Sequence, residues 1–110
     1  MMAHSKASLS THVLDTSTGR PAAGVPVTLS TAGTTVAEGV TDDDGRISPL
    51  AGDLAPGDHT LRFDTGAWFA AQGTTAFYPE VVVTFTVADD RHHHVPLLLN
   101  PFGYSTYRGS

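Results

Sequence analysis

Hydrophobic and polar residues alternate with a period of two along most of the chain. The alternation covers residues 9–14, 25–29, 34–41, 46–50, 59–63, 81–87, 93–99 and 104–108. A period of two sends successive side chains to opposite faces of a strand. Turn-forming residues separate the segments, and the Asp44-Gly45 pair is the strongest hairpin signal among them. The pattern predicts about eight short strands and favours an antiparallel β-sandwich.

Three local features refine this prediction. Pro26 lies within the second segment, where a proline indicates a sheet edge or a bulge. Pro49 is expected to end the short strand over residues 46–50. A single helix should follow residue 63, capped by Asp64 or Thr65 and stopped by Gly73.

Composition narrows the class of protein. The 110 residues suffice for one domain, and we expect residues 1–7 to form a flexible tail and residues 8–110 to form the domain. Charged residues make up only 15%, against a typical share of about 25%, so partner subunits should cover part of the surface. A net charge of −5 without a basic patch argues against nucleic acid. No apolar run approaches the ~20 residues of a membrane span, and no secretory signal opens the chain, so we expect a cytoplasmic protein.

Histidine is the first candidate for chemistry, because it titrates near neutral pH and can transfer protons. His12 faces outward if Leu9 and Val13 face the core, and His94 faces outward by the same argument. The two could line one site if their strands are neighbours. A surface histidine more commonly does no chemistry, so the pattern alone leaves both interpretations open.

The run from His92 to His94 raises the question of a metal. Strand geometry turns His93 to the opposite face, so the three cannot bind one ion together. His12, His92 and His94 could form a three-histidine zinc site, but no carboxylate with the spacing of a zinc enzyme accompanies them. The sequence therefore argues against a metal site but leaves one open.

The chain ends in Tyr107, Arg108, Gly109 and Ser110. Chain ends commonly fray, and a disordered tail is one interpretation. The alternation after Tyr104 instead predicts a strand that runs to the last residue and holds these groups in place.

Four separated segments resemble the transthyretin-like 5-hydroxyisourate hydrolases. They are LSTHVLD (9–15) with GRPA (19–22), TDDDGR (41–46), HHHVPLLL (92–99) and YSTYRGS (104–110). The segments occur in the family's order over nearly the whole chain. The resemblance implies a transthyretin-like (prealbumin-like), antiparallel Greek-key β-sandwich of two four-stranded sheets with one short helix. It also implies a homotetramer, a dimer of dimers with active sites in the channel between dimers, and no cofactor.

The activity that the resemblance implies is hydrolysis of the ring amide of 5-hydroxyisourate to 2-oxo-4-hydroxy-4-carboxy-5-ureidoimidazoline, a step of urate degradation. The catalytic set would be His12, Arg46 and His94, and the substrate pocket would be shaped by Tyr107, Arg108, Gly109 and Ser110. The family usually has tyrosine at the position of His93, so the matching catalytic residue is His94. The resemblance leaves the role of His92 open, as it does the choice of general base between His12 and His94.

Two other functions compete with this one. Transthyretin uses the same fold to carry a small aromatic ligand in the tetramer channel, and a plain sandwich domain could be part of a larger enzyme. The paired histidines and the Tyr-Arg-Gly-Ser end favour the hydrolase over the carrier. The shortness of the chain and the motif at its end argue against the appended domain.

Overall fold

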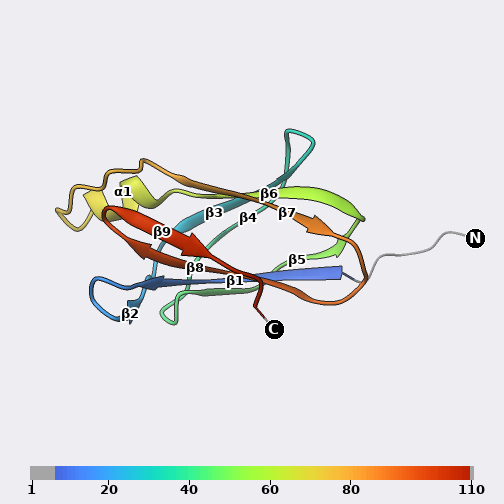
Figure 1. Cartoon of the computed structure of the whole chain (residues 1–110), viewed down its shortest axis with the longest axis horizontal. Coiled ribbons are helices and arrows are strands. Elements are labelled where there is room, and N and C mark those ends of the chain that lie inside the picture. Colours follow the sequence, from blue (N-terminus) through green and yellow to red (C-terminus); the bar gives the residue numbers. More distant parts are fainter. Residues whose placement is uncertain (1–6, 110) are drawn as a thin grey trace, which may run out of the picture.

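The computed structural model describes residues 7–109, which form nine strands and one short helix (Figure 1). The elements are β1 (Ala7–Asp15), β2 (Arg20–Pro21), β3 (Pro26–Thr31), β4 (Thr34–Val40), β5 (Arg46–Leu54), β6 (Gly57–Phe63), α1 (Thr65–Ala70), β7 (Val81–Val87), β8 (His93–Asn100) and β9 (Gly103–Thr106). Within residues 7–109, no helix has the length and hydropathy to span a bilayer. The expected tail lies outside the described residues except for Ala7, which is buried and already belongs to β1.

The strands form two layered sheets (Figure 1). One sheet has the order β2-β1-β8-β9, with β5 also paired to β1, and the other has the order β4-β3-β6-β7. The first sheet has five strands and not four because the two-residue β2 pairs with the end of β1 beyond the reach of β5. The pairing of β1 with β8 is parallel, whereas all other strand pairs of the described chain are antiparallel. The predicted antiparallel sandwich is therefore confirmed, with this one parallel pair as an exception.

The core lies between the two sheets, where the period-two pattern places it. Leu9 and Val13 of β1 and Leu29, Leu61 and Phe63 of the opposite sheet have no exposed surface. Burying one such side chain contributes roughly 1.5–3 kcal/mol to folding. Because the odd-numbered residues of β1 are held in this core, the even-numbered residues face outward.

Several local predictions need correction. Pro26 is the first residue of β3, a central strand, so it marks neither an edge nor a bulge. Pro49 lies inside β5 and does not end it, because β5 pairs on one side only, with β1, and an edge strand tolerates proline. Asp64 occupies the helix N-cap but makes no capping hydrogen bond with its side chain. The last strand, β9, ends at Thr106 and does not run to the end of the chain.

The turn before β5 fixes the start of that strand against β1. The Asp42 carboxylate accepts hydrogen bonds from the backbone N–H groups of Asp44 and Arg46, both at 2.9 Å. Gly45 has a φ of +74°, and its carbonyl accepts a 2.7 Å hydrogen bond from the N–H of Val13. A Cβ at this position would overlap the Val13 carbonyl oxygen, so only glycine fits. The turn therefore places Arg46 opposite the middle of β1.

Candidate active site

The register of β1 with β5 and β8 brings the predicted catalytic residues onto one sheet face. His12 pairs with Arg46 of β5, and Ser10 pairs with His94 of β8. Ser10 and His12 both belong to the outward-facing set of β1, two residues apart. His94 also points away from the core and is half-buried, whereas Arg46 is exposed. The sheet thus brings together three side chains that are far apart in the sequence.

Serine hydroxyls connect the histidines of this face. Ser10 Oγ lies 2.7 Å from His94 Nδ1 and 2.8 Å from His92 Nε2. His92 Nδ1 lies 2.5 Å from Ser8 Oγ. Beside this chain of hydrogen bonds is a polar hollow of about 180 Å³, lined by Ser10, Thr11, Arg46, Ser48, His92 and His94. Sequence reasoning missed Ser10, although its position two residues before His12 places it on the same face.

The surroundings of His94 favour a neutral imidazole. Burial is the largest cause that lowers the pKa of His94 below its ordinary value of 6.5, followed by the positive charge of Arg46 and by His12 and His92. Its Nδ1 is bonded to Ser10, and within residues 7–109 its Nε2 has no hydrogen-bond partner. A neutral imidazole with one free ring nitrogen can accept a proton from water near neutral pH.

The residues at the end of the chain pack against His94. The N–H of Gly109 donates a 2.9 Å hydrogen bond to the carbonyl of His94, and the two residues form an isolated bridge. A Cβ on Gly109 would overlap Cδ2 of the His94 ring, so the glycine lets the backbone touch the imidazole. Ser110 lies outside the described residues. Beyond the end of β9, the bridge between Gly109 and His94 therefore holds the last described residues in place.

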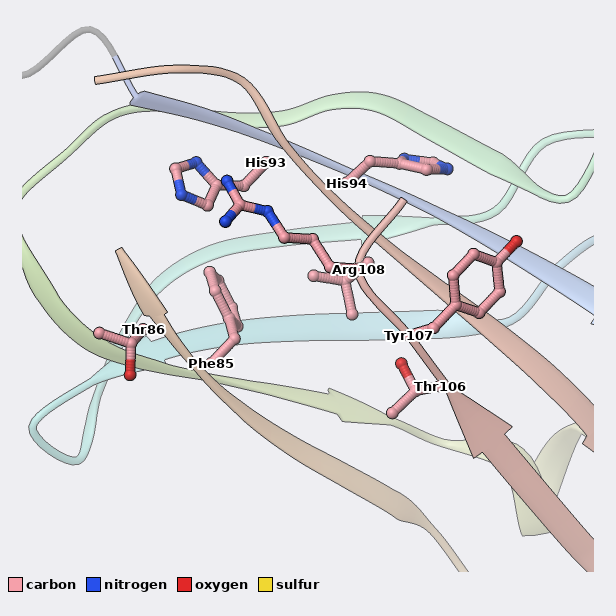
Figure 2. A pocket seen from close by; sticks show the side chains of 8 residues that line it. Phe85, Thr86, His93, His94, Thr106, Tyr107 and Arg108 are labelled. Atoms are coloured by element: carbon pink, nitrogen blue, oxygen red, sulfur yellow. The ribbon is translucent and has the colours of Figure 1, made fainter. Parts of the chain in front are cut away.

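A second cavity of about 200 Å³ borders this segment (Figure 2). It is lined by Phe85, Thr86, His93, His94, Val95, Thr106, Tyr107 and Arg108. Figure 2 shows the Arg108 side chain extending toward the His93 side of the cavity, while Tyr107 points the opposite way. Tyr107 and Arg108 therefore border this cavity and not the polar hollow, although His94 lines both.

His93 faces inward, as the strand period predicts. It is buried, and its Nδ1 lies 2.8 Å from the carbonyl oxygen of Arg91. Its Nε2 lies 3.8 Å from the carboxylate of Asp89. His93 therefore packs on the opposite face of β8 from His94. Among residues 7–109, no three histidine, aspartate or glutamate side chains are grouped to hold a metal ion.

The topology and the site define a small β-sandwich protein that carries a histidine–arginine cluster on the outer face of one sheet. Residues 9–109 match the model of the HIUase/Transthyretin family, and the chain belongs to this family. The family resemblance of the four sequence segments is thereby confirmed, as is the transthyretin-like fold.

Three relatives show what the chain is similar to. A 5-hydroxyisourate hydrolase of Caulobacter vibrioides is 47% identical over 93% of this chain and 97% of its own length. The solved structure of Klebsiella pneumoniae 5-hydroxyisourate hydrolase is 46% identical, covers 94% of both chains and has a TM-score of 0.89. Sea bream transthyretin in complex with thyroxine is 35% identical, covers 92% of this chain and 93% of its own, and has a TM-score of 0.86.

Proposed function

We propose that this chain is a 5-hydroxyisourate hydrolase that opens the ring amide of its substrate to give 2-oxo-4-hydroxy-4-carboxy-5-ureidoimidazoline. The observation that carries the proposal is the register of β1, which brings His12, Arg46 and His94 to one sheet face. The higher identity to the two hydrolases than to the thyroxine-bound transthyretin supports an enzyme over a carrier. No cofactor is needed for the hydrolysis of an amide by acid–base groups.

The proposed mechanism assigns a task to each residue. His94 Nε2 removes a proton from water, and the resulting hydroxide adds to the ring carbonyl carbon. The guanidinium of Arg46, which stays charged at all relevant pH values, binds the substrate oxygens and stabilises the developing oxyanion. His12 orients the water. The carbon–nitrogen bond then breaks, and the ring nitrogen leaves with the proton that His94 Nε2 took from water. By family resemblance, Tyr107, Arg108, Gly109 and Ser110 shape the pocket around the ring.

Product identity tests this proposal. Carbon-13-labelled urate is oxidised by a urate oxidase, and the NMR spectrum is followed with and without this protein. We expect the protein to convert the 5-hydroxyisourate signals faster into those of one ring-opened species with a new carboxylate carbon. A carrier would leave the spontaneous course of these signals in place and shift them only by binding.

We also propose the homotetramer, a dimer of dimers with active sites in the channel between dimers. Several large apolar side chains of the single chain are exposed, among them Phe77 (70%) and Phe102 (73%). Phe77, Tyr78 and Tyr104 form a chain of edge-to-face ring contacts, and all three are exposed. Burying such groups against other subunits is the ordinary way to remove them from water. Light scattering after size-exclusion chromatography should give about four times 11.5 kDa, and a mass of 11.5 kDa would contradict the tetramer.

Gly109→Ala should lower activity without unfolding the protein. The added methyl group collides with the His94 ring, and either the ring or the chain end must move. A displacement of about 1 Å can reduce catalysis on the order of 10²-fold, so we expect kcat/KM to fall by roughly 10-fold or more. Circular dichroism should be unchanged, because the position lies beyond the last strand. A Gly109→Ala variant with the kinetics of the wild type would contradict the contact.

The pH dependence of kcat/KM should reflect the environment of His94. The base works only when neutral, so activity falls as the pH drops through the His94 pKa. Burial, Arg46 of β5, His12 of β1 and the neighbouring His92 all lower that pKa, which places the acid limb below pH 6.5. Removing the charge in an Arg46→Ala variant should move the limb upward while lowering the rate. An acid limb above pH 6.5 in the wild type would contradict a neutral His94 base.

A further inference from the structure

Ser10 occupies an unusual position for a residue outside the predicted catalytic set. It lies on the outer face of β1, yet only 4% of its surface is exposed. Its hydroxyl is within hydrogen-bond distance of two different imidazole rings, His92 and His94. We propose that Ser10 is a positioning residue that orients His94 and connects it to His92 as a proton relay. This inference rests on the proposed function, because it assumes His94 as the base.

The number of protons available determines how the relay is arranged. A serine hydroxyl donates one proton, so it can serve only one unprotonated ring nitrogen. At least one of His92 Nε2 and His94 Nδ1 must therefore carry a proton and donate it to Ser10 Oγ. When both rings are neutral and Ser10 donates its proton to one of them, fixing the tautomer of one ring fixes the tautomer of the other.

One of the two arrangements prepares His94 as a base. His94 Nδ1–H donates to Ser10, the Ser10 hydroxyl donates to His92 Nε2, and His92 Nδ1–H donates to Ser8 Oγ. His94 Nε2 then carries only a lone pair and can take the proton of the attacking water. In the other arrangement every hydrogen bond is reversed: Ser8 donates to His92 Nδ1, His92 Nε2–H donates to Ser10, and Ser10 donates to His94 Nδ1. His94 Nε2 then carries the proton of that ring and is a donor.

The relay carries away the charge that catalysis would leave on His94. After Nε2 takes a proton from water, the Nδ1 proton of His94 passes to Ser10 Oγ. The original Ser10 proton passes at the same time to His92 Nε2, so the serine stays neutral. His94 is left neutral, protonated on Nε2, and His92 holds the positive charge. Only O–H and N–H bonds form or break in this step, and both transfers reverse when His94 Nε2 gives its proton to the leaving nitrogen.

Electrostatics favours this transfer. The groups that face His94 are Arg46 from β5, His12 from β1 and His92 from the segment before β8, and the effect of all three is to disfavour a charge on its ring. His92 is exposed, so water stabilises a charge there better than at the half-buried His94. Ser10 is the only described residue whose side chain is hydrogen-bonded to both rings.

Kinetics of Ser10 variants test the relay. In Ser10→Ala, kcat should fall by roughly 10-fold or more, a part of the ~10²–10⁴-fold supplied by a general base, while KM changes little. Ser10→Thr keeps a hydroxyl and should recover most of this loss. Ser105→Ala, which removes a hydroxyl from an exposed position of β9 in the same sheet, is the matched control and should have the kinetics of the wild type. An unchanged kcat in Ser10→Ala, or no recovery in Ser10→Thr, would overturn the inference.

His92→Gln separates the relay from simple positioning. Glutamine can still hydrogen-bond to Ser10 but cannot accept a proton. In mixtures of H2O and D2O, the wild type should show a curved dependence of kcat on deuterium content, because several protons move together. The His92→Gln variant should show a linear dependence and a lower kcat. A linear dependence in both proteins would overturn the proton relay and leave Ser10 with a structural role alone.

Nitrogen-15 NMR of the imidazole rings tests the hydrogen bonds without any turnover. In the free protein, Ser10→Ala should shift the ring nitrogen signals of both His92 and His94, whereas Ser105→Ala should leave them in place. Unmoved signals would overturn the relay even if the protein is active. Conversely, shifted signals in a protein that does not act on 5-hydroxyisourate would overturn the proposed function and leave the hydrogen-bonded chain established.

Discussion

Replacing His94 by alanine should lower kcat for 5-hydroxyisourate by about 10²–10⁴-fold, the range contributed by a positioned general base. His94 is the histidine whose pKa is lowered by burial and by neighbouring positive charge, and its Nε2 has no partner among residues 7–109. Removing the ring removes both the base and the Nδ1–H group that donates a hydrogen bond to Ser10. The rate is measured from the ultraviolet decay of substrate made by a urate oxidase, under saturating substrate.

The fold of this variant must be intact for the result to count. His94 is half-buried on the outer face of β8, so the alanine leaves no hole in the core between the sheets. Circular dichroism and the mass in solution should therefore match those of the wild type. If His94→Ala keeps kcat within about a factor of three of the wild type, the ~10²–10⁴-fold role of a general base does not belong to this residue. His12→Ala would then be the variant to measure, because His12 is the other candidate base.

Phe63→Ala should lower the free energy of unfolding by about 3–5 kcal/mol, the usual cost of deleting a buried aromatic ring. Phe63 is fully buried in β6, where it pairs with Val27 of β3 and Val81 of β7. The alanine leaves a cavity between the two sheets that the rigid strands cannot close. Urea denaturation measures the change, at one fixed protein concentration because subunit association also contributes to stability.

Arg62→Ala provides the matched control for this experiment. Arg62 is the next residue along β6 but faces outward, where its side chain is 49% exposed and forms a 2.7 Å ion pair with Glu80. Water screens an exposed ion pair, so this variant should lose little stability. A loss below about 1 kcal/mol in Phe63→Ala would contradict the packing of the core around this ring.

The sequence predicts most of the fold because its signals are local. The period of two correctly separates His93, which faces the interior, from His94, which faces out. The Asp44-Gly45 pair correctly marks the turn before β5. It does not form the hairpin that this pair predicts, because β4 and β5 belong to different sheets. The prediction that Pro49 ends its strand is wrong. A proline can lie within a strand where no second strand pairs on that side, and the tertiary structure decides which strands pair.

The site could be predicted only in part. The family resemblance selects His12, Arg46 and His94, and the structure brings them to one face, but their catalytic roles remain predictions. Nothing local in the sequence indicates that β1 and β8 pair in parallel, since residues 10 and 94 are 84 positions apart. The contact of Ser10 with two histidines depends on that pairing, and it is visible only in three dimensions.

The most direct test of the central claim is the initial rate of 5-hydroxyisourate decay as a function of the concentration of this protein. The substrate is generated in the cuvette from urate by a urate oxidase, and its ultraviolet absorbance is followed once urate is exhausted. Hydrolysis by this chain predicts a rate that rises in proportion to protein concentration and that is abolished by heat denaturation. A decay that stays at the spontaneous rate at every protein concentration would contradict the enzyme and leave a ligand carrier of the same fold.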